Sequence, residues 1–146
     1  GPNIMKGYLN LPEQTSAVLV DGWFWTGDIA RFDENGYVYL LDRSKDMIIS
    51  GGENVYSSEV ENVLYKHPDV MECAVIGLPD DKLGEKLMAV VVSHVDTDPT
   101  PEGIIAHCRE MIGGYKIPRL IEFVDAMPKN AMGKILKNEL RKIYSQ

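Results

Sequence analysis

Two nearly all-apolar segments separated by a short turn constrain the fold of this chain more than any other feature. The first segment runs from Val70 to Leu78 and the second from Lys86 to Val95. Residues 77–81 read Gly-Leu-Pro-Asp-Asp, a composition typical of a turn. The β-branched content of both segments predicts strands. We therefore expect a small sheet in the second part of the chain.

Three helices are predicted around this sheet. Ser58 with Glu61 three residues later predicts a capping box, and Pro68 ends that helical run. Thr100 followed by Pro101 predicts the start of the second helix. The expected buried faces hold Val60, Val63 and Leu64; then Ile104, Ile105, Cys108, Met111 and Ile112; and, in a terminal helix, Leu136, Leu140, Ile143 and Tyr144.

Further strands are predicted at Met47–Ile49 and at Arg119–Val124. The order from Met47 is then strand, helix, strand, strand, helix, strand, helix. This order predicts an α+β fold with a small three-stranded core sheet flanked by helices, and we expect the helices on one side of it.

Residues 1–42 show a different pattern, of turns and short strands. Asp21-Gly22 and Glu34-Asn35-Gly36 predict turns, and the aromatic runs Trp23–Trp25 and Tyr37–Leu41 predict strands. A hairpin or two buries little apolar area and is marginal alone. We expect this β-rich segment to belong to a larger body.

Composition excludes several classes of protein. The net charge of −7 argues against a broad nucleic-acid surface, and no apolar run reaches the ~20 residues of a membrane span. His67, His94 and His107 share no metal-ligand spacing with each other or with the cysteines, so no metal site is expected. Cys73 and Cys108 fit buried free thiols, which favours a cytoplasmic protein.

No self-sufficient catalytic centre is visible, because the Walker, dinucleotide-binding and nucleophile-elbow motifs are absent. Four short segments still contain residues of types that bind ligands or take part in catalysis. Asp28 either caps a turn or accepts hydrogen bonds from a ribose diol. Residues 42–46 form a charged linker. Gly51-Gly52 makes either a tight turn or room for a ligand. Lys134 is either a solubilising charge or an ammonium delivered to phosphate or carboxylate oxygens.

These spots, in this order, resemble the carboxyl-terminal part of the AMP-forming acyl-CoA synthetases, the superfamily that includes firefly luciferase and peptide-synthetase adenylation domains. The likeness covers nearly the whole chain and is carried by Gly1–Tyr8, Pro12–Thr15, Asp21–Asp28, Asp42–Ile48, Gly51–Val55, Glu59–Glu61 and Pro128–Lys134.

The resemblance implies two parts. Residues 1–42 correspond to the last β segment of a large AMP-binding domain, and residues 43–146 to a small mobile lid. It also implies roles for individual positions: Asp28 and Arg43 hold the adenylate ribose, Lys45 is the hinge, Gly51 and Gly52 line the pantetheine tunnel, and Lys134 supports adenylation. Leu83 stands where some relatives place tryptophan against the nucleotide of CoA.

The implied activity is an acid–thiol ligation that uses ATP and CoA as substrates and a small carboxylic acid. Mg²⁺ is expected through the N-terminal AMP-binding domain, which is the expected partner, and the fragment alone is expected to be inactive. CoA is favoured as acceptor because no carrier domain follows the terminal helix. The alternatives are the lid of a peptide-synthetase-like enzyme and a small-molecule-sensing α+β module.

Overall fold

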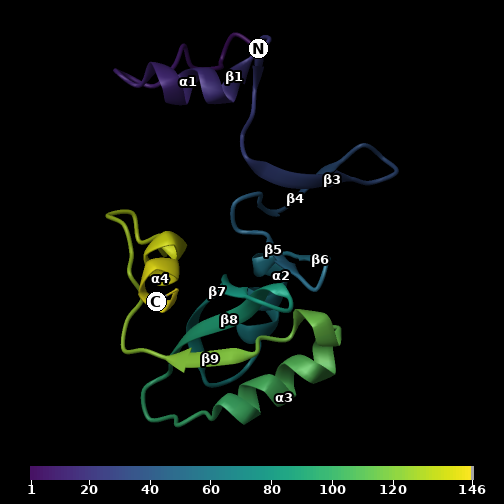
Figure 1. Cartoon of the computed structure of the whole chain (residues 1–146), viewed down its shortest axis with the longest axis vertical. Helices are drawn as coiled ribbons and strands as arrows, with labels where there is room; N and C mark the ends of the chain where they lie inside the picture. The colour runs from purple at the N-terminus through teal and green to yellow at the C-terminus, as the bar shows by residue number, and fades with distance from the viewer. Residues whose placement is uncertain (146) are drawn as a thin grey trace. The chain divides into compact units, whose positions relative to one another are not determined.

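The computed structural model describes residues 1–145, which form two compact units, Gly1–Ser44 and a second unit that starts at Lys45 (Figure 1). The first unit contains, in chain order, α1 (Pro12–Val18), β1 (Leu19–Val20), β2 (Trp23–Phe24), β3 (Asp28–Phe32) and β4 (Val38–Arg43). β1 pairs with β2 and β3 pairs with β4, both antiparallel. The turns between the paired strands are those that the sequence predicts.

Helix α1 corrects the expectation that the segment before residue 42 holds only turns and strands. Pro12 occupies the first turn of this helix, where a missing N–H costs nothing. Thr15 ties the helix to the preceding chain, because its Oγ1 accepts the N–H of Tyr8 (2.9 Å) and donates to the carbonyl oxygen of Leu11 (2.8 Å). These contacts join residues that are close in the sequence, but no periodic apolar pattern predicts this helix.

The second unit carries the main core. It contains, in chain order, β5 (Ile48–Ser50), β6 (Glu53–Val55), α2 (Ser57–Leu64), β7 (Val70–Asp80), β8 (Gly84–Ser93), α3 (Pro101–Met111), the 3₁₀ turn η1 (Gly114–Lys116), β9 (Leu120–Phe123) and α4 (Lys137–Tyr144). The sheet runs in the order β6-β5-β8-β7, and β9 pairs in parallel with β8. The predicted three-stranded core is therefore β7, β8 and β9, extended by β5 and by β6, which the sequence did not predict.

Both faces of this sheet are covered. On one face, alternate residues of β7 and β8 such as Val75 and Ala89 pack with α2 and α3. On the other face, the intervening residues such as Ile76 and Val90 pack with Leu140 of α4. Because successive side chains of a strand point to opposite faces, a sheet buried on both sides requires nearly all-apolar strands.

The expectation that all helices lie on one side of the sheet is therefore wrong, since α4 covers the face opposite α2 and α3 (Figure 1). Three expected core residues are also exposed, Met111 by 43%, Leu136 by 37% and Ile143 by 57%. An amphipathic stripe shows that a helix packs on something, but it does not say which side of the sheet it covers.

The predicted starts of α3 and α2 agree with the structure to different degrees. Thr100 caps α3 as expected, because its Oγ1 accepts the N–H of Gly103 at 3.1 Å. Helix α2 begins at Ser57, so Tyr56 and not Ser58 is its N-cap residue, and the Tyr56 side chain makes no cap hydrogen bond.

Candidate functional site

Asp28 and Arg43 are brought together by the hairpin of β3 and β4. They are register partners across the two strands, and Arg43 Nε lies 2.8 Å from Asp28 Oδ1. Arg43 Nη1 also donates to the carbonyl oxygen of Thr26 at 3.1 Å. The two residues expected to act as a pair are thus a pair in this structure, both in the first unit.

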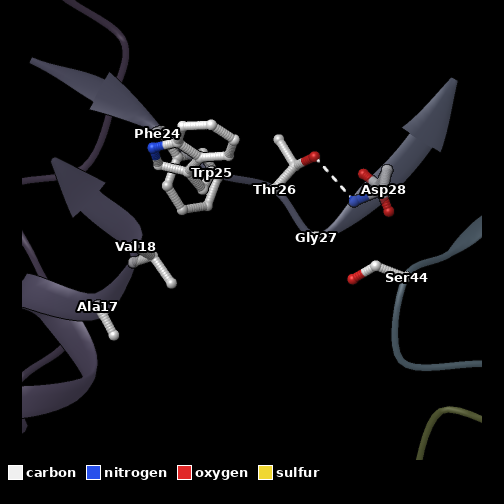
Figure 2. Close-up of a pocket in the computed structure, with 8 residues that line it drawn as sticks. All are labelled: Ala17, Val18, Phe24, Trp25, Thr26, Gly27, Asp28 and Ser44. Carbon is white, nitrogen blue, oxygen red and sulfur yellow. Dashed lines mark hydrogen bonds between the residues drawn. The ribbon is translucent and has the colours of Figure 1, made fainter.

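Asp28 lies at the edge of an open recess in the first unit (Figure 2). The recess is lined by Ala17, Val18, Phe24, Trp25, Thr26, Gly27, Asp28 and Ser44. The N–H of Asp28 donates to Thr26 Oγ1 at 3.1 Å, so the start of β3 is held locally. Apolar side chains, including those of Phe24 and Trp25, line one side of the recess, and Asp28 and Ser44 line the other (Figure 2).

Gly51 and Gly52 form the two-residue turn between β5 and β6. Their φ angles are 62° and 85°, the left-handed values that this hairpin turn needs and that glycine adopts without cost. A Cβ at Gly52 would meet no atom within 4 Å. The tight turn that the sequence suggested is therefore present, and the space beside Gly52 is open.

The glycine turn lies against the turn that joins β7 to β8. The N–H of Gly51 donates to the carbonyl oxygen of Leu83 at 2.8 Å. Asp80 shapes the second turn, because its Oδ1 accepts the N–H groups of Lys82 and Leu83 at 3.1 Å each. These bonds hold the pKa of Asp80 below its ordinary value. The structure thus places side by side two spots that the resemblance connects with CoA.

Lys134 sits in a loop before α4 that the antiparallel bridge between Lys129 and Ile135 closes. Asn130 holds this loop together: its Oδ1 accepts the N–H groups of Met132 (3.0 Å) and Lys134 (2.9 Å), and its own N–H donates to the carbonyl oxygen of Lys134 (2.9 Å). Gly133 takes a φ of 79° at the tip. Lys134 itself is exposed, and no carboxylate pairs with it among residues 1–145. The loop therefore presents a free ammonium on a defined backbone.

Ion pairs anchor this loop and α4 to the rest of the unit. Lys129 pairs with Glu72 of β7 at the start of the loop. At the start of α4, Lys137 Nζ lies 2.7 Å from Glu61 Oε1, with both side chains 17% exposed. Sequence reasoning missed this pair. Its one signal is a lysine in the first turn of a helix, where the helix dipole disfavours a cation that has no partner.

The hinge candidate Lys45 is the first residue of the second unit, and Arg43 belongs to the first. The next residue, Asp46, pairs with Arg141 of α4 at 3.0 Å. The beginning of the second unit is thus bound to the helix that follows the lysine loop. Lys134 and the glycine turn lie on separate loops of this unit (Figure 1).

Among residues 1–145, no three His, Cys, Asp or Glu side chains cluster closely enough to hold an ion. Over the same residues, no helix combines the length and apolar character needed to cross a bilayer.

Comparison with known proteins assigns the family. The model of the AMP-binding enzyme C-terminal domain matches residues 59–134. The chain belongs to this family. It shares 52% identity over 148 residues with a feruloyl-CoA synthase of Amycolatopsis sp, covering 99% of this chain and 29% of that protein. It shares 48% identity with a long-chain-fatty-acid–CoA ligase of Yersinia pestis, covering 97% and 25%.

A solved structure agrees with this assignment. ATP-bound MatB from Rhodopseudomonas palustris is 40% identical, with a TM-score of 0.91 over 100% of this chain and 29% of that one. This chain thus spans under a third of the length of the relatives that it matches. The family resemblance carried by the seven motifs and the predicted α+β fold class are both confirmed.

Proposed function

We propose that this chain is the C-terminal part of an ATP-dependent acyl-CoA synthetase, which converts a carboxylic acid, ATP and CoA to acyl-CoA, AMP and pyrophosphate. The observation that carries the proposal is that the relatives matched along almost the whole chain are CoA synthases and ligases three to four times its length. We infer that this chain supplies one part of the active site of such an enzyme.

The first unit supports this proposal, because it has the surface of an incomplete domain. None of its residues is buried, and Trp23, Phe32 and Leu40 are 75%, 72% and 72% exposed. Large exposed apolar surfaces of this kind mark contacts with further protein. The AMP-binding domain that would precede residue 1 is the proposed partner.

Asp28 and Arg43 are proposed to hold the ribose of the adenylate. A carboxylate accepts hydrogen bonds from both hydroxyls of a ribose diol. The guanidinium of Arg43, 2.8 Å away, orients this carboxylate and adds donors of its own. The pair is 26% and 47% exposed at Asp28 and Arg43, so both side chains are accessible to a ligand.

Lys134 is proposed to act in the adenylation step. Attack of a carboxylate on the α-phosphate of ATP brings two anions together, and the charge at the reacting oxygens must be stabilised as the new bond forms. An ammonium is a compact point charge suited to this task. The loop that Asn130 organises holds the backbone of Lys134 in one conformation, which lowers the cost of delivering the side chain.

The thioester step is proposed to use the glycine turn instead. Once pyrophosphate has left, the ammonium must withdraw so that the thiol of CoA can attack the acyl carbon. A hinge at Lys45 would exchange the two loops, and the free energy for this exchange comes from different contacts in the two states. The open space beside Gly52 would admit the pantetheine arm.

Mg²⁺ is proposed to bind through the N-terminal AMP-binding domain, as the family resemblance implies.

The proposal is tested in the full-length enzyme by measuring the two half-reactions separately. Lys134→Ala should slow adenylate formation by about 10²–10³-fold and leave thioester formation from supplied acyl-AMP nearly unchanged. Gly52→Leu should do the reverse. Lys142→Ala is a matched control, because Lys142 is 71% exposed and pairs only with Glu139 among the described ion pairs. Equal losses in both half-reactions would contradict the assignment.

A separate experiment tests the broader class. The present chain mixed with the AMP-binding part of its protein should restore acid-dependent pyrophosphate release. A small-molecule-sensing module would bind its ligand alone and would restore nothing.

A further inference from the structure

The glycine turn depends on few backbone bonds for its position. β5 and β6 have three residues each, and β5 meets β8 at a single register pair, Ser50 with Gly84. A short hairpin with so little pairing is marginal by itself. The bond from the Gly51 N–H to the Leu83 carbonyl oxygen and the burial of Ile48 and Val55 also hold the hairpin, and a side-chain contact adds to them.

Glu85, the second residue of β8, supplies such a side-chain contact. Its Oε2 accepts the backbone N–H of Ile49 at 2.8 Å, two residues before Gly51. Hydrogen bonds to an ionised carboxylate are roughly twice as strong as neutral ones. Ile48 and Ser50 of β5 are buried, whereas the Ile49 side chain is 50% exposed, so the bond from the Ile49 N–H to Glu85 adds to the packing of its neighbours in holding this strand.

Gly77 makes room for the carboxylate. A Cβ at this position of β7 would lie 2.6 Å from Glu85 Oε1 and 3.0 Å from Ile48 Cγ2. The φ of Gly77 is not in the left-handed region, so its backbone suits any residue. Glycine inside a strand weakens the strand, and here the space that Glu85 occupies explains its presence.

We propose that Glu85, seated over Gly77, is a positioning residue for thioester formation, because it holds the Gly51–Gly52 turn where the thiol passes. The inference rests on the proposed role of Gly52. A reacting group misplaced by about 1 Å can cost up to ~10²-fold in rate, so a loosened turn should affect this step. The lysine loop lies elsewhere in the unit, and adenylation should not depend on Glu85.

The test uses the full-length enzyme and both half-reactions. Glu85→Ala should lower thioester formation from acyl-AMP by about tenfold and change adenylate formation less than about twofold. Glu85→Gln keeps an oxygen that accepts from Ile49 and should restore most of the rate. Hydrogen exchange at the Ile49 amide should rise in Glu85→Ala and stay low in Glu85→Gln.

Gly77→Ala provides a second arm, because the added methyl group displaces the Glu85 carboxylate. It should reproduce the Glu85→Ala phenotype, and the double variant should be no slower than Gly77→Ala alone, since both changes break the same contact. If Gly77→Ala fails to fold, the two Glu85 variants and the hydrogen-exchange measurement still test the role of Glu85.

Gly52→Leu, measured in parallel, separates the role of Glu85 from the proposed function of the glycine turn. If Gly52→Leu blocks thioester formation and Glu85→Ala does not, the role of Glu85 is refuted and the proposed function stands. If Gly52→Leu leaves thioester formation intact, the proposed function of the turn fails. Equal slowing of both half-reactions by Glu85→Ala would also overturn the inference.

Discussion

The contact between Lys137 and Glu61 leads to a quantitative prediction about stability. Lys137 Nζ lies 2.7 Å from Glu61 Oε1 and 2.7 Å from Ser57 Oγ, so one ammonium joins the start of α4 to α2. Glu61 Oε1 also accepts the N–H of Val75, at 2.8 Å, on the edge of the sheet. Lys137→Met removes the charge and keeps most of the aliphatic stem.

The expected loss follows from the burial of the pair. Both side chains are 17% exposed, so solvent screens this pair less than a surface pair. A hydrogen bond to a charged group contributes about 1.5–3 kcal/mol net. Because methionine still packs its stem, we expect Lys137→Met to lower the free energy of unfolding by about 2 kcal/mol. At a slope of about 1–2 kcal/mol per M, the urea midpoint should fall by roughly 1–2 M.

Urea unfolding of the 146-residue chain, followed by far-UV circular dichroism, measures this effect. Tryptophan fluorescence would not, because both tryptophans, Trp23 and Trp25, lie in the first unit. The matched control is Lys142→Met, which removes a pair with Glu139 that is 71% and 48% exposed and should cost under about 0.5 kcal/mol. If the midpoints of the two variants coincide, the reasoning from burial is wrong.

Two further perturbations have defined outcomes. Leu140→Ala should lower the free energy of unfolding by about 2–5 kcal/mol in the same assay, because Leu140 is 2% exposed and anchors α4 on the sheet; an exposed site such as Ile143→Ala should change it far less. Burial raises the pKa of Cys73 from 9.0 to about 12. The folded state then keeps a proton that the unfolded state loses, so stability should fall as pH rises from 9 toward 12. Cys73→Ala should flatten this decline, and an unchanged slope would contradict it.

Several local features were predictable from sequence because neighbouring residues determine them. The Gly51-Gly52 turn needs two left-handed residues, and the chain has two glycines there. Thr100 and Pro101 predict the start of α3, because Thr100 supplies a capping hydrogen bond and Pro101 supplies a helical φ angle. The pairing of Asp28 with Arg43 was expected from the resemblance alone, and the hairpin register accounts for it.

Glu61 shows why other features could not be predicted. The spacing of Ser58 and Glu61 satisfies the capping-box rule, but it does not predict that the Glu61 carboxylate accepts the N–H of Val75 and pairs with Lys137. Only the folded chain brings these distant partners to Glu61. Glu85 and Gly77 raise the same difficulty, since no sequence rule connects a carboxylate with a glycine that leaves room for it.

The sequence by itself determined most of the strands, turns and helices of the second unit, with β6 as an exception, and it determined which family the chain belongs to. These depend on interactions within a few residues or on motifs of a few residues. Only the tertiary structure decided which face of the sheet α4 covers, which carboxylate meets Lys137, and what braces the glycine turn. The physical reason is that these contacts join residues far apart along the chain, 80 positions for Lys137 and Ser57 and 36 for Glu85 and Ile49, and they exist only after the sheet has formed.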